Sequence, residues 1–189
     1  MAGTICPAGN GTNPFPHNPD NAATGCNAVI TIAANGSATT VVKDTTPYEN
    51  SEDVLIGVVN NAATVLGTMN ITGATGSGIF GFDGDGICTF TFVGSTYCTA
   101  SQISGTDPGD YQGPTSTFTN IASSGDSGTA NFNPPIPANG GTTYFSLEGI
   151  PTASLTITTT STPAPPALLL LLTGLAVLGM WQLGRRFAS

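Results

Sequence analysis

Two acidic side chains on a glycine-rich segment are the clearest candidates for metal chemistry in this sequence. Asp83 and Asp85 alternate with glycines in the run GFDGDG, residues 81–86. Carboxylate oxygens at positions i and i+2 of a flexible loop are the type of ligand that Ca²⁺ takes in proteins. Further carboxylates lie in the segments 44–53 and 107–110, which also read as loops.

The spacing around this pair departs from that of an EF-hand. Ile87 stands at the fifth loop position and Gly94 at the twelfth, where Asp or Asn and then Glu are required. A tight turn is the competing interpretation, because Asp-Gly supplies the positive φ that a hairpin needs. We favour the turn and keep a Ca²⁺ site of Asp83, Asp85 and other loop oxygens as the alternative. No other cofactor is expected.

Four cysteines define the expected redox compartment. They allow three disulfide connectivities, and the sequence alone does not choose among them. We favour Cys6–Cys26 and Cys88–Cys98, because each bridge closes a short polar loop. Neither spacing is that of a Cys-x-x-Cys zinc site. Oxidised cysteines predict an envelope or extracellular setting.

The charged residues exclude several classes of function. They make up only 7% of the chain, the net charge is −8, and all 11 acidic residues lie between Asp20 and Glu148. Such a body repels phosphate backbones, so we expect no nucleic-acid partner. One histidine (His17) and one lysine (Lys43) leave few general bases or amine nucleophiles. We therefore expect no enzyme.

An apolar segment near the C-terminus predicts a membrane-spanning helix. No charged residue occurs from Ala167 to Leu183, and a helix of that length spans roughly 25 Å, workable in a thin bilayer. Arg185 and Arg186 follow at once, as expected on the cytoplasmic side of a span. At the other end of the chain, Met1–Thr4 does not begin a signal peptide. We expect the leader to lie upstream.

This tail resembles a known sorting signal. Pro163–Ala164–Pro165, an apolar helix and Arg185–Arg186 together look like the PEP-CTERM tail of Gram-negative bacteria, although Ala164 occupies the place of the Glu that gives the family its name. The body segments PYENSEDVLIGVVNN, IFGFDGDGI and PPIPANGGTTYFSLEG are also similar to stretches of uncharacterised PEP-CTERM ectodomains. The resemblance implies export, a transient stay in the inner membrane, and processing by an exosortase-like enzyme.

The elements that would position these residues are strands. Gly, Ser, Thr and Asn are abundant, so helix is disfavoured, and short apolar runs alternate with turn residues every 8–15 positions. This pattern predicts an all-β fold, a two-sheet antiparallel β-sandwich of about ten short strands followed by a single C-terminal transmembrane helix. The expected strands are 28–33, 39–43, 54–60, 65–71, 79–82, 87–93, 117–122, 129–132, 142–147 and 153–158.

The predicted organisation has five parts. They are a Pro/Gly/Asn-rich segment (1–27), the sandwich ectodomain (28–159), a Thr/Pro spacer (160–166), the sorting helix (167–184) and a basic cytoplasmic tail (185–189). We expect a structural or adhesive protein that is tethered to the membrane as a precursor and then reaches the cell surface or the exopolysaccharide matrix, where polysaccharide is its expected partner. The alternatives are a Ca²⁺-dependent carbohydrate-binding module and a permanently anchored envelope protein.

Overall fold

The protein is a two-layer β structure, seen here in a computed structural model that describes residues 5–7, 25–49, 51–90, 98–149 and 156–161. These residues form eight strands and two short helices. The strands are β1 (Ala28–Ile32), β2 (Ala38–Val42), β3 (Val54–Asn60), β4 (Leu66–Thr72), β5 (Ser116–Thr119), β6 (Ser127–Ile136), β7 (Gly141–Leu147) and β8 (Thr156–Ser161); the helices are α1 (Ala100–Ile103) and η3, a 3₁₀ turn (Gly109–Tyr111).

The first sheet has the strand order β2-β1-β3-β7. Its β1–β3 pair is parallel, which corrects the prediction of wholly antiparallel sheets. The reason is the path of the chain. β2 runs back along β1 until Val42 lies opposite Ala28, so the segment 43–53 starts at the end of the sheet where β1 begins. It stays at that end, and β3 therefore leaves in the same direction as β1.

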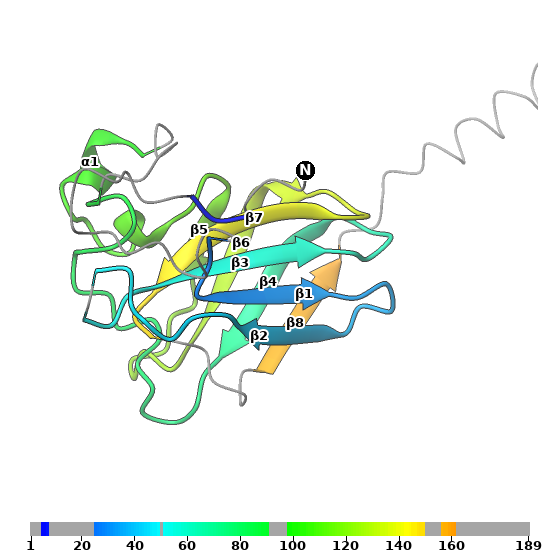
Figure 1. The fold of residues 1–189 in the computed structure, drawn as a ribbon, viewed down its shortest axis with the longest axis horizontal. Helices are drawn as coiled ribbons and strands as arrows, with labels where there is room; N and C mark the ends of the chain where they lie inside the picture. The colour runs from blue at the N-terminus through cyan, green and yellow to red at the C-terminus, as the bar shows by residue number, and fades with distance from the viewer. Residues whose placement is uncertain (1–4, 8–24, 50, 91–97, 150–155, 162–189) are drawn as a thin grey trace, which may run out of the picture.

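The second sheet has the order β5-β6-β4-β8, and its pairs are all antiparallel. The predicted strand at 129–132 is longer than expected, because β6 continues to Ile136. The predicted strand at 153–158 begins later, at Thr156, and ends at Ser161, while 153–155 lie outside the described residues. The strands of this sheet run obliquely behind those of the first (Figure 1).

The core lies between the two sheets. Alternate side chains of β3, Val54, Ile56 and Val58, pack in one buried cluster with Met69 and Ile71 of β4. Each fully buried aliphatic or aromatic side chain contributes roughly 1.5–3 kcal/mol relative to exposure. The arrangement confirms the predicted packing of two sheets face to face.

The opposite face of β3 is covered as well. Leu55 belongs to a second buried cluster that contains the Cys6–Cys26 disulfide. Gly57 makes this close approach feasible, because a Cβ at that position would lie 2.6 Å from the Cys26 sulfur. These contacts explain why the run VLIGVV is apolar without alternation: both of its faces are buried.

Two predicted strands are instead parts of an irregular loop. Residues 79–82 and 87–90 form turns and coil, and 91–93 lie outside the described residues. Glycines at positions 81, 84 and 86 interrupt the segment, and Gly84 takes a φ of +98° that a strand does not allow. Ile79, Phe80 and Ile87 are buried even so. The partly buried Phe82 ring lies 5.3 Å, centroid to centroid, from that of Phe118 on β5.

The predicted transmembrane helix at 167–184 lies outside the described residues, as do the spacer from residue 162 onward and the basic tail. No helix within the described ranges is long and apolar enough to cross a membrane. The only α-helix among them, α1, begins with a capping box in which the Thr99 side chain and the Gln102 backbone and side chain satisfy one another.

Candidate functional site

The register of two neighbouring strands brings a pair of acidic residues together. β3 and β7 are antiparallel, and Val54 lies opposite Leu147. Asp53 directly precedes β3 and Glu148 directly follows β7, so the two residues emerge side by side at one end of the first sheet. This is the end of the sandwich that also carries α1 (Figure 1).

A compact turn before β3 fixes the position of Asp53 and its neighbour Glu52. The Glu49 carboxylate accepts hydrogen bonds from the backbone N–H groups of both residues, at 2.7 Å for Asp53 and 2.5 Å for Glu52. The Tyr48 hydroxyl donates to Asp53 Oδ2 at 2.8 Å. Both Tyr48 and Asp53 are fully buried.

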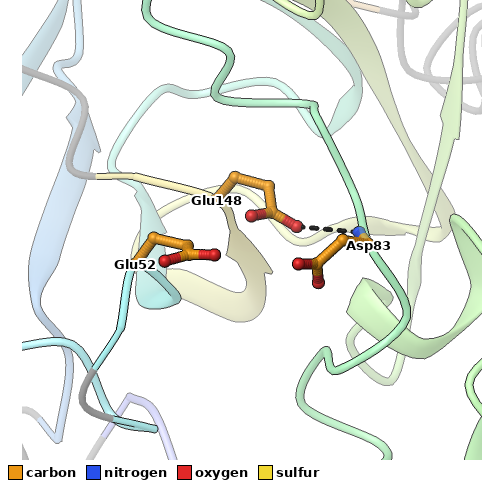
Figure 2. A group of neighbouring side chains, drawn as sticks. All are labelled: Glu52, Asp83 and Glu148. Carbon is orange, nitrogen blue, oxygen red and sulfur yellow. Dashed lines mark hydrogen bonds between the residues drawn. The ribbon is translucent and has the colours of Figure 1, made fainter.

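The glycine-rich loop lies against the end of β7. Its Asp83 N–H donates to Glu148 Oε1 at 3.1 Å, and the Glu148 N–H donates to the carbonyl of Ile79. Figure 2 shows the carboxylates of Glu52, Asp83 and Glu148 turned toward one another from three separate segments of the chain. Asp83 lies close to Glu52 and Glu148, and Asp85 lies close to Asp53 and Glu148, so each sequence-predicted residue meets acids that are 31 to 65 positions away along the chain.

One hydroxyl lies at the centre of this arrangement. Tyr111 of η3 is fully buried, and its hydroxyl is 2.8 Å from Asp85 Oδ1 and 3.3 Å from Asp83 Oδ1. The same hydroxyl contacts Glu148 Oε1. A tyrosine carries one hydroxyl proton and can donate it to one acceptor at a time. Two of the three carboxylates are therefore left without this donor at any moment.

Five carboxylates make up what we call the carboxylate cluster: Glu52, Asp53, Asp83, Asp85 and Glu148. Within this cluster there are two sets of three oxygen atoms. In each set, the three atoms all lie within 4.8 Å of one another. One set comes from Glu52, Asp83 and Glu148, and the other from Asp53, Asp85 and Glu148. Glu148 belongs to both sets and joins them into one group.

The cluster contains no positive charge to offset these acids. The single basic residue in the part of the chain that the structure describes is Lys43, just after β2. Within the cluster, the Asp53 carboxylate is the one with an unsatisfied buried oxygen: its Oδ1 has no hydrogen-bond partner among the described residues. A buried carboxylate with one oxygen left without a partner is costly, and its charge must be neutralised by a proton or by a cation.

The electrostatics reflect this crowding. Burial, followed by the charges of Glu148, Asp85 and Glu49, raises the pKa of Asp53 to about 9. Burial and then the charges of Asp83 and Asp85 raise the pKa of Glu148 to about 7, although the hydrogen bond from Tyr111 opposes this shift. A shared hydrogen bond with Asp85, together with partial burial, raises the pKa of Asp83.

A second layer of contacts holds the glycine-rich loop over Tyr111. The Gly86 N–H donates to Asp110 Oδ2 at 3.1 Å, and the Ile87 N–H donates to the Ser146 hydroxyl at 3.3 Å. A side chain on Gly86 would lie 2.7 Å from the Tyr111 ring. The loop therefore needs glycine at this position in order to pack against η3.

The other predicted site residues fall into two groups. Cys6 is bonded to Cys26 and Cys88 to Cys98, and the described cysteines include no free thiol. The favoured connectivity is thus the one that the structure contains. The sorting residues Pro163, Ala164, Pro165, Arg185 and Arg186 lie outside the described residues.

Sequence reasoning did not assign four of these residues to the site. Glu148 was noted only as the last acidic residue, Tyr111 was not singled out, and Glu52 and Asp53 were noted only as part of the acidic segment 44–53. The available signal was that Asp53 and Glu148 each border an apolar strand. It becomes useful only once β3 and β7 are known to be antiparallel neighbours.

Comparison of the chain with protein-family models, with curated proteins and with solved structures yields no match.

Proposed function

We propose that this chain is an exported structural or adhesive protein, whose disulfide-bonded β-sandwich works at the cell surface or in an extracellular polysaccharide matrix. The observation that carries the proposal is the pairing of all four cysteines in two disulfides. Disulfides of this kind persist in oxidising compartments and are rare in the cytosol.

The composition of the body supports the same proposal. Charged residues make up only 7% of the chain, so hydroxyl and amide side chains must supply most of the polar groups that interact with water at its surface. A net charge of −8 also favours hydration and disfavours association with other polyanions. Such a surface suits a protein that stays hydrated among polysaccharide chains.

The C-terminal segment would supply the sorting step. In this proposal the apolar residues 167–184 hold the precursor in the inner membrane, and Arg185 with Arg186 keep its end on the cytoplasmic side. Pro163 and Pro165 present an extended segment to an exosortase-like enzyme, because proline disfavours both helix and central strand. Cleavage would then release the ectodomain or transfer it to the surface.

The test follows the full chain, with an export signal peptide fused before Met1, in a Gram-negative host that carries an exosortase-like enzyme. Three forms are compared: wild type, the tail variant Pro163→Ala/Pro165→Ala, and Lys43→Ser as a control outside the tail. Wild type and control should appear at the surface or in the medium with a shortened C-terminus. The tail variant should accumulate uncut in the membrane.

Two outcomes would change the proposal. A wild-type protein that stays in the membrane with its C-terminus intact would favour the permanently anchored alternative. A wild-type protein found in the cytosol with four reduced cysteines would contradict export altogether.

A further inference from the structure

We propose that the carboxylate cluster is a calcium site, in which one Ca²⁺ joins the beginning of β3, the glycine-rich loop and the end of β7. The inference goes beyond the proposed export and does not depend on it. The oxygen ligands would come from three segments that are distant in the sequence: Glu52 and Asp53, Asp83 and Asp85, and Glu148. Glu148 is the central ligand because it belongs to both sets of three oxygens.

The first argument is geometric. Oxygen atoms that lie within 4.8 Å of one another can all reach a single ion at Ca²⁺–oxygen distances of about 2.3–2.6 Å. Figure 2 shows three of the carboxylates turned toward one another; Glu52 and Asp83 are exposed and Glu148 is half-buried.

The second argument is independent of the clustering and comes from Asp53 alone. Its side chain is fully buried, and Oδ1 has no hydrogen-bond partner among the described residues. One oxygen of this carboxylate belongs to the set shared with Asp85 and Glu148. Buried polar atoms in folded proteins nearly always have a partner, so this orphaned carboxylate oxygen needs a proton or a cation, and the grouping of Asp53 with Asp85 and Glu148 favours a cation.

The chemistry of the ligands selects the class of ion. Every donor in the cluster is a hard oxygen, and the described residues offer neither an imidazole nor a free thiolate, since the described cysteines are all in disulfides. Such donors suit Ca²⁺, Mg²⁺ or Mn²⁺ and not zinc or copper. Mg²⁺ prefers a rigid octahedral shell and retains several waters, whereas Ca²⁺ accepts many carboxylates in irregular geometry. The irregular loop geometry here favours Ca²⁺.

The site would act on the structure by bridging. The segment that contains Asp83 and Asp85 is held to β7 and Glu148 by a few hydrogen bonds: Asp83 N–H to the Glu148 carboxylate, Glu148 N–H to the Ile79 carbonyl, and Ile87 N–H to the Ser146 hydroxyl. An ion bound by Asp85, Asp53 and Glu148 together would fasten this loop to the sheet. Calcium would therefore stiffen the end of the sandwich that carries α1.

The experiment uses the full-length oxidised protein in detergent micelles, stripped with EGTA and titrated with CaCl₂ or MgCl₂ in a calorimeter. Thermal unfolding is followed in parallel. We expect saturable binding of one Ca²⁺ per chain, weaker binding of Mg²⁺, and a melting temperature that rises with Ca²⁺ concentration as mass action requires.

Two isosteric variants and a matched control sharpen the test. Glu148→Gln and Asp85→Asn should each weaken Ca²⁺ binding at least tenfold. In EGTA at neutral pH, both should melt at or above the wild-type temperature, because each removes one of several mutually repelling charges. Asp126→Asn removes an acid that belongs to neither set of oxygens and should bind Ca²⁺ like wild type.

A variant of a Ca²⁺ ligand should bind Ca²⁺ more weakly and yet be as stable as wild type, or more stable, in EGTA. A variant of a residue with only a structural role should instead lose stability in EGTA. The proposal is overturned if millimolar Ca²⁺ neither binds nor shifts the melting temperature, which would mean that the carboxylates share protons instead. It is also overturned if Glu148→Gln and Asp85→Asn bind Ca²⁺ as tightly as Asp126→Asn does. A site that takes Mg²⁺ and rejects Ca²⁺ would contradict the choice of ion.

Discussion

Asp53 shows how a single buried carboxylate can set the behaviour of a domain. It directly precedes the most buried strand of the first sheet. The Tyr48 hydroxyl donates to one of its carboxylate oxygens, the other oxygen has no partner among the described residues, and other acidic residues lie nearby. An ionised carboxylate in such surroundings is destabilising unless a proton or a cation accompanies it. The stability of the metal-free protein should therefore depend on pH in a direction unusual for an acidic protein.

That dependence is our first prediction. The pKa values of Asp53 and Glu148 are raised in the folded protein from 3.8 to about 9 and from 4.5 to about 7. Between pH 4 and 9 the folded state thus holds more protons than the unfolded state, and the free energy of unfolding must fall as pH rises. The slope is at most about 1.4 kcal/mol per pH unit for each group.

Denaturant unfolding in EGTA at several pH values measures this slope. Urea midpoints should be highest near pH 4–5 and decline steadily toward pH 9. A midpoint that rises from pH 4 to 7, as salt-bridged acids would produce, contradicts the burial of Asp53 described here.

At the scale of secondary structure, the site depends on how a loop packs against two strand ends. Gly86 has no room for a side chain, since a Cβ would lie 2.7 Å from both the Asp110 backbone and the Tyr111 ring. At Gly109, the first residue of η3, an added Cβ would meet only the Gln102 side chain at 3.4 Å, an ordinary contact. The two glycines thus form a matched pair for mutation.

We predict that Gly86→Ala destabilises the protein by roughly 1–3 kcal/mol, the usual cost of overpacking, while Gly109→Ala changes stability by less than about 0.5 kcal/mol. Chemical denaturation of the two variants beside wild type gives both values. Equal stabilities for the two variants would show that the loop does not pack on η3 as described.

The sequence predicted most strands but not their arrangement. β1, β3 and β7 follow apolar or alternating runs, which fix both strand type and approximate bounds. The segments 79–82 and 87–93 were predicted as strands because the first is a short apolar run and the second alternates apolar and polar residues; they include Ile79, Phe80 and Ile87. Those side chains are buried, but from a loop whose glycines prevent regular pairing.

The candidate site was only partly predictable for a related reason. Asp83 and Asp85 share one loop and form a visible local pattern. Asp53 and Glu148 become neighbours through the antiparallel register of β3 and β7, a long-range pairing that local patterns do not encode. The parallel β1–β3 pair was missed for the same reason, because it depends on where the segment 43–53 crosses.

At the scale of the whole molecule, two disulfides reinforce a core of modest size. Cys6–Cys26 and Cys88–Cys98 close loops of 20 and 10 residues in sequence separation. The first covers the outer face of β3, where both cysteines are buried with Leu55. Each bridge restricts the unfolded chain and, in the loop-entropy model, contributes about 3 kcal/mol.

We predict that replacing either cysteine pair with alanine lowers the free energy of unfolding by roughly 2–4 kcal/mol, and that reduction of wild type has a larger effect than either double variant. Unfolding with and without a reductant that reaches the buried cysteines gives the comparison. A wild-type midpoint unaffected by complete reduction would mean that the disulfides are not structural.

The central claim is that this β-sandwich works outside the cytoplasm after delivery by its C-terminal segment. The most direct test is intact and peptide mass spectrometry of the native protein from separated cell fractions, after alkylation of free thiols under denaturing conditions. We predict a protein in the envelope or medium with no alkylated cysteine, a leader removed before Cys6, and a C-terminus that precedes residue 167. An uncleaved, cytosolic chain with all four cysteines alkylated would contradict the account.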